Sequence, residues 1–192
     1  WYQITDATWR QENDHDRTGN NSIKRENWIT YRDRLVYQNY VKNSPICPIN
    51  TLMTHGFILT KYGPPASDER DYLPVRNELR AAFLCGSGMV ELYNDYDLMG
   101  SINGGALWAD LAECIAWQER NADVLPDAHW VGGNPWTGSK AEVYGWAAWN
   151  GTKSTLALRN GANDAQEFKF TLRSALNVPA NVQGSIILRS AF

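Results

Sequence analysis

An aspartate near the start of the chain, Asp6, stands where a carboxylate can do acid–base chemistry. It directly follows the β-prone run Trp1–Thr5, and residues that end the strands of a parallel barrel gather at the substrate site. A carboxyl group in such a place can donate a proton to a leaving group or accept one from water. Aspartates also cap helices and close turns, which is the structural alternative for Asp6.

The loop after Asp6 brings further candidates for contacting a substrate. Trp9 offers a flat aromatic face, and Arg10 offers a cation for a polar or anionic substituent. The same loop contains several acids, so a salt-bridged surface loop is an equally good interpretation.

Polar side chains near the ends of two later strands are also candidates. His55 ends the second predicted strand, and Asp95 follows the third, which contains Glu91. His55 can instead be a core histidine, and Asp95 can begin the next turn. Glu91, inside a buried strand, must be paired, either with substrate hydroxyls or with an arginine such as Arg80.

Metal and cofactor motifs are weak in this chain. Asp14-x-Asp16 resembles the opening of a calcium loop, but Arg25 stands where that loop needs a bidentate glutamate. The three histidines have no ligand spacing, the three cysteines have no C-x-x-C spacing, and no glycine-rich phosphate loop occurs. We therefore expect no metal and no cofactor, and we interpret the cysteines as buried thiols.

The composition is that of a globular protein with a sizeable core. The chain has 192 residues, 43% hydrophobic and 20% charged, with a net charge of −3. This charge gives no basic field for nucleic acid, and no apolar run is long enough to cross a membrane. Nine Trp and nine Tyr are many, and aromatic faces of this kind serve both cores and sugar sites.

The order of predicted elements indicates an α/β fold over the first two thirds of the chain. Strands are expected over residues 1–5, 49–53 and 89–93, and helices over 26–42, 75–84 and about 107–120. Alternating strands and helices favour parallel strands with right-handed crossovers. A complete barrel needs about 250 residues, so residues 1–130 would supply three of its units.

Past Asn134-Pro135 the pattern changes to short β-rich runs. We expect strands over 142–149, 154–159, 167–172 and 185–189, separated by turns such as Asn150-Gly151. Four strands make one sheet, whereas an independent sandwich has about seven. A partial antiparallel β-sandwich is therefore predicted here. The chain also begins with its first residues already in a strand, so we expect it to be a piece of a longer protein.

Three segments resemble retaining glycoside hydrolases of the α-galactosidase superfamily. They are W-Y-Q-I-T-D-A-T-W at 1–9, R-N-E-L-R-A-A-F-L-C-G-S-G-M-V-E-L-Y at 76–93, and the linker before E-V-Y-G-W-A-A-W-N-G at 142–151. Tyr2 and Ala7 depart from the pattern, in which an arginine and a second acid are common. The resemblance covers nearly the whole chain.

This resemblance implies a fold, an activity and a set of residues. Residues 1–132 would be the last three units of a (β/α)8 TIM barrel, and residues 133–192 part of a C-terminal β-sandwich. Asp6 would be the general acid/base, with Trp1, Trp9, Arg10, His55, Glu91 and Asp95 binding a carbohydrate such as an α-galactoside.

The nucleophile of such an enzyme is a second carboxylate, which no segment of this chain resembles. Retaining hydrolases hold the two carboxyl groups about 5 to 5.5 Å apart. We therefore expect the missing N-terminal part of the same polypeptide as a partner, and no activity from residues 1–192 alone. The family favours a secreted or periplasmic enzyme. The alternative is a non-catalytic carbohydrate-binding protein that uses exposed aromatics on its C-terminal strands.

Overall fold

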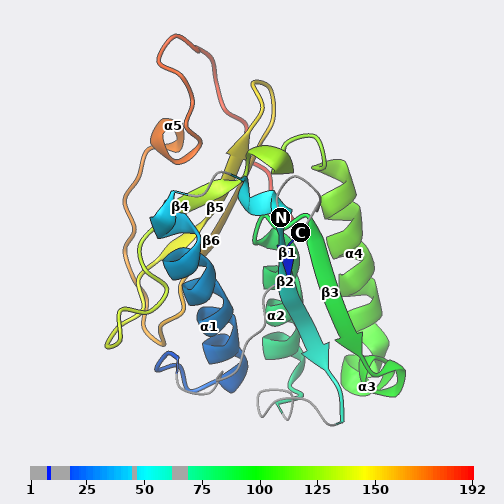
Figure 1. Ribbon diagram of the computed structural model, residues 1–192. Helices are drawn as coiled ribbons and strands as arrows, with labels where there is room; N and C mark the ends of the chain where they lie inside the picture. The colour runs from blue at the N-terminus through cyan, green and yellow to red at the C-terminus, as the bar shows by residue number, and fades with distance from the viewer. Residues whose placement is uncertain (1–7, 10–17, 45–46, 62–68) are drawn as a thin grey trace.

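The computed structural model describes residues 8–9, 18–44, 47–61 and 69–192 (Figure 1). They form two three-stranded sheets, one parallel and one antiparallel, together with helices. In Figure 1 the antiparallel sheet lies on the side of helix α1, and helix α4 lies on the opposite side.

The parallel sheet has the order β1-β2-β3, formed by Thr8–Trp9, Leu52–Leu59 and Met89–Asn94. β1 pairs only with the start of β2, Thr8 opposite Leu52. The register between β2 and β3 shifts between Thr54 and Phe57. A Cβ on Gly56 would lie 2.0 Å from the Glu91 carbonyl oxygen, so this close approach of the two strands requires glycine.

Helices α2 (Tyr72–Leu84) and α4 (Ala106–Arg120) cover one face of the parallel sheet. Their apolar sides form the main core, in which Leu79 of α2 and Leu107 of α4 are fully buried together with Phe57 of β2. The short α3 (Tyr96–Ser101) connects β3 to α4. The described residues also form short 3-10 helices over Val41–Asn43, Ile49–Thr51, Ile102–Gly105 and Leu125–Asp127.

Helix α1 (Lys24–Asn39) is joined to α2 and β2 by buried charges. Arg25 donates to the Glu78 carboxylate, and Arg32 lies 3.8 Å from the other oxygen of that group. The Arg32 guanidinium also donates to the Gly56 carbonyl at 2.6 Å. Because these charges are buried, their pairing contributes to the fold: removing Glu78 would take one anionic partner from each of two buried cations.

The antiparallel sheet has the order β4-β5-β6, formed by His129–Gly132, Tyr144–Trp149 and Ser154–Arg159. β5 is buried along most of its length because both of its faces are covered. One face packs on α1 and α2, and the other packs against the segment that contains α5 (Leu172–Ala175). Tyr144 and Trp146 of β5 pack in one cluster with Tyr40, Ile49 and Cys85. The two sheets therefore belong to one packed body.

The predicted barrel followed by a β-sandwich is wrong for the described residues. They form a small α/β domain with two open three-stranded sheets. Alternation of strands and helices specifies parallel pairing, but not the number of strands that close a barrel. In the C-terminal region the runs 142–149 and 154–159 contain strands β5 and β6, whereas 167–172 leads into α5 and 185–189 is exposed and belongs to no strand.

Candidate functional site

Glu91, Tyr93 and Asp95 lie along one face of β3 toward its carboxyl end. The Asp95 amide donates to the Leu59 carbonyl at 2.8 Å, so the pairing with β2 continues one residue past the strand. Val90 packs against the core beneath α2 and α4. Since neighbouring residues of a strand point to opposite faces, the odd-numbered side chains lie on the face away from these helices. Tyr93 is 42% exposed there.

The first two members of this row are hydrogen-bonded to each other. The Tyr93 hydroxyl donates to Glu91 Oε1 at 2.5 Å. This hydrogen bond, assisted by desolvation and by the Glu91 charge, raises the pKa of Tyr93. The single proton of the phenol is used in this hydrogen bond, so the oxygens of the pair act as hydrogen-bond acceptors.

Asp95 has a structural role, which was the alternative to ligand binding expected for this residue. Its Oδ1 accepts from the amides of Asp97 at 3.0 Å and Leu98 at 3.3 Å, which caps α3. Its Oδ2 lies 3.6 Å from Lys61 Nζ, just beyond the end of β2. The Asp95 carboxylate thus joins the ends of two neighbouring parallel strands.

Glu91 and Asp95 are too far apart to form a catalytic pair by themselves. Four residues along a strand span about 13 Å, because each residue advances about 3.3 Å. The two carboxyl groups of a retaining glycosidase are about 5 to 5.5 Å apart, and those of an inverting enzyme about 6.5 to 9.5 Å. The spacing of these two acids therefore favours hydrogen bonding to ligand hydroxyls over cleavage of a glycosidic bond.

The structure describes only some of the other predicted site residues. Trp1, Asp6 and Arg10 lie outside the described residues. The backbone of Trp9 belongs to β1, and the backbone of His55 belongs to β2. His55 was expected at the end of its strand, but β2 continues to Leu59, so the residue lies inside the strand.

Two members of this site were missed in the sequence. Lys61 lies two residues past the end of β2, which was predicted to end earlier. Tyr93 was treated only as part of a strand, although its spacing of two from Glu91 places both side chains on one face.

The parts of the chain that the structure describes contain no group of three or more histidine, cysteine or acidic side chains that could hold a metal ion. Among the same residues, no helix combines the length and hydropathy needed to cross a bilayer. Comparison of the chain with protein-family models, with curated proteins and with solved structures finds no match.

Proposed function

We propose that this chain takes part in the retaining hydrolysis of α-linked glycosides such as α-galactosides, with Asp6 as general acid/base. The structural observation behind the proposal is the row of Glu91, Tyr93 and Asp95 on the face of the parallel sheet away from α2 and α4, near its carboxyl end. Carboxylates, a phenol and the nearby Lys61 ammonium are groups that bind sugar hydroxyls. The sequence resemblance at 1–9 and 76–93 supports the same activity.

The proposed chemistry needs two carboxyl groups in different roles. A nucleophilic carboxylate attacks the anomeric carbon while the Asp6 carboxylic acid protonates the departing glycosidic oxygen, and the carbon–oxygen bond breaks. Asp6, now a carboxylate, then takes a proton from water, whose oxygen attacks the anomeric carbon and releases the enzyme's nucleophile. The nucleophile comes from a residue outside the motifs recognised in this chain.

Replacing Asp6 by Asn in the enzyme that contains these residues tests the assignment. We expect kcat to fall by about 10²- to 10⁴-fold on alkyl α-galactosides, whose leaving groups need protonation. Aryl α-galactosides with activated leaving groups should be much less affected. The matched control is Asp164→Asn, which removes an exposed carboxylate and should leave both rates unchanged. Equal losses on both substrates would remove Asp6 from the acid/base role.

A secreted or periplasmic location is part of this proposal, and fractionation of cells that express the native gene tests it. The alternative of a carbohydrate-binding protein with exposed aromatics on its C-terminal strands has less support. Tyr144 is fully buried and Trp146 is 5% exposed, so neither of these rings offers a flat face to a glycan. Hydrolysis is therefore the function we propose.

A further inference from the structure

Three consecutive apolar side chains of the C-terminal region are exposed to solvent. Ile186, Ile187 and Leu188 are 49%, 80% and 73% exposed. They belong to the run 185–189, for which the sequence predicts a strand but which lies outside every strand of the structure. Single exposed apolar residues are common in folded proteins, whereas contiguous ones mark surfaces that bind a partner.

The backbone of this run is also open to pairing. Among the described residues, none forms a hydrogen bond with the backbone amides or carbonyls of residues 185–189. Isoleucine is β-branched and favours strands, and a row of unpaired backbone groups is a template for another strand. A β-strand is therefore the partner that fits the run, because strand addition uses backbone groups and alternate side chains together.

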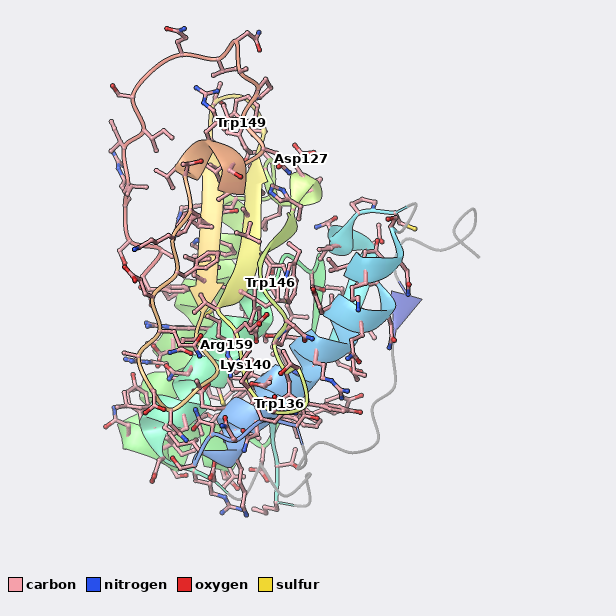
Figure 2. All side chains as sticks on the ribbon, turned by 90° about the vertical axis from the view of Figure 1, so that its left-hand side faces the viewer. Asp127, Trp136, Lys140, Trp146, Trp149 and Arg159 are labelled. Atoms are coloured by element: carbon pink, nitrogen blue, oxygen red, sulfur yellow. The ribbon has the colours of Figure 1, made fainter. Side chains whose placement is uncertain are left out.

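Contacts on both sides of the run hold it in place. Before it, Arg173 of α5 donates to the Val182 carbonyl at 2.7 Å. Figure 2 looks onto the antiparallel sheet and shows α5 lying over its strands beside Trp149. After the run, the Phe192 ring lies against the main core, with its centroid 6.4 Å from that of Trp117. Because both flanks are already fixed, less conformational entropy is lost when the run pairs.

The side chains of the run are complementary to those of a second copy. Consider two copies that pair antiparallel about a two-fold axis at Ile187, perpendicular to the strands. The two Ile187 side chains then lie opposite each other, and Ile186 lies opposite Leu188 of the partner subunit. Ser185 lies opposite Arg189 of the partner subunit, so apolar groups meet apolar groups and no like charges are opposed.

The charges and the neighbouring registers both favour this axis. The two Arg189 side chains are four residues apart along the ladder, about 13 Å, which exceeds the screening length of about 8 Å at physiological salt. An axis at Leu188 would place Ile187 opposite Arg189 of the partner subunit, and an axis at Ile186 would place it opposite Ser185. We propose that residues 185–189 form the interface of a homodimer, in which the runs of two copies pair as antiparallel strands.

The size of this interface sets the expected affinity. Each copy contributes three apolar side chains and a ladder of five residues. Interfaces that bury less than about 1,200 Å² are typical of weak and reversible association. We therefore expect a dissociation constant of about 10 to 100 µM, so that the protein is monomeric when dilute and dimeric when concentrated.

Sedimentation velocity of the 192-residue protein between about 1 and 500 µM tests the proposal. The average mass should rise from that of one copy toward that of two and should not exceed it. Ile187→Lys places two ammonium groups opposite each other at the axis and should raise the dissociation constant at least about tenfold. Leu158→Lys on β6 is the matched control, because it replaces another exposed apolar side chain and should leave the constant unchanged. Circular dichroism confirms that each variant is folded.

Cross-linking tests the register. In a Cys47→Ser background, which leaves only the two buried cysteines, Ile187→Cys places two thiols opposite each other, with Cα atoms about 4.5 to 5.5 Å apart. A disulfide spans this separation, so oxidised glutathione should link the dimer covalently. Ile186→Cys is the control, because residue 186 lies opposite Leu188 of the partner subunit and should cross-link far less.

Four outcomes would overturn the proposal. They are a parent protein that stays monomeric at about 500 µM, growth beyond two copies, unchanged association of Ile187→Lys, and equal cross-linking of the two cysteine variants. None of these measurements depends on glycosidase activity, so they test the dimer separately from the proposed function.

Discussion

At the scale of single residues, the buried Tyr144 hydroxyl connects three elements of the interior. It donates to Asp33 Oδ2 at 2.5 Å and accepts from Arg159 Nη1 at 2.6 Å, so it links α1 to β6 through β5. Tyr144→Phe keeps the ring stack on Trp130 but removes one partner from each of these two groups. We expect the free energy of unfolding in urea to fall by about 1 to 3 kcal/mol. Tyr96→Phe, at a hydroxyl on a residue that is 76% exposed, should change it by less than about 0.5 kcal/mol.

The same hydroxyl predicts an alkaline limit to stability. Burial raises the pKa of Tyr144 well above its ordinary value of about 10, with Asp33 adding to the shift and Arg159 opposing it. The unfolded phenol releases its proton near pH 10, whereas the folded one retains it. Its contribution is therefore complete below about pH 10 and is lost as the pH rises further. Urea titrations at increasing pH should show a flatter alkaline decline for Tyr144→Phe than for the parent; parallel declines would contradict this.

At the scale of elements, Glu142 organises the connection between β4 and β5. Its Oε2 accepts from the Asn134 amide at 2.9 Å, and its Oε1 lies 3.3 Å from Lys140 Nζ. The hydrogen bond from Asn134 lowers the pKa of Glu142 against a smaller effect of desolvation, and Lys140 lowers it further. A depressed carboxyl pKa stabilises the fold above the unfolded value of about 4.3, and this contribution is lost as the pH falls through the folded pKa.

Glu142→Gln should therefore reduce the dependence of stability on pH on the acid side. Because the Glu142 side chain is 37% exposed, the loss at neutral pH should stay below about 1 kcal/mol. Urea unfolding followed from neutral to acidic pH measures both quantities. Glu167→Gln, at a side chain that is 77% exposed, serves as the control. It should show the same fall in the free energy of unfolding at acidic pH (the acid limb) as the parent. An unchanged acid limb in Glu142→Gln would refute the role of this carboxylate.

The elements also show which parts of the fold the sequence could predict. The spacing of Leu107, Leu111 and Cys114 identified α4, because a helix buries one continuous stripe. Ile115, one position after Cys114, is 41% exposed because it lies at the edge of that stripe. β4 was missed: His129–Gly132 is short and lies in a Pro- and Gly-containing linker, and its pairing with β5 decides its conformation.

The candidate site, like the fold, was predictable from the sequence only in part. Glu91 and Asp95 were found because they lie in and after a strand with a clear apolar pattern. By contrast, a cleft lined by α2 and β5 could not be predicted, because its residues, such as Ala81 and Trp146, are distant in sequence and come together only in the folded chain. Local patterns define elements, whereas sites of this kind depend on tertiary contacts.

At the scale of the whole molecule, the two sheets should unfold together. β4 lies within the predicted domain 1–132, yet it pairs with β5 of the predicted domain 133–192. Arg159 of β6 is held by Glu26 and Thr30 of α1, at 2.8 and 3.0 Å. Contacts of this kind couple the two parts, so we expect one transition in urea, with the same midpoint by tryptophan fluorescence and by far-ultraviolet circular dichroism.

Breaking the ion pair between β6 and α1 should move that transition without dividing it. Arg159→Met leaves Glu26 largely buried without its cation, and we expect a loss of about 3 kcal/mol with both probes still coincident. Lys169→Met is the control, because its ion pair with Glu167 is more than three-quarters exposed and is worth at most about 0.5 kcal/mol. If the midpoints of the two probes separated in the parent protein, the sheets would be independent folding units and the domain boundary predicted near residue 132 would gain support. Coincident midpoints in the parent and in Arg159→Met would instead mean that the buried contacts of Tyr144, Trp146 and Arg159 make the folding of each sheet depend on the other.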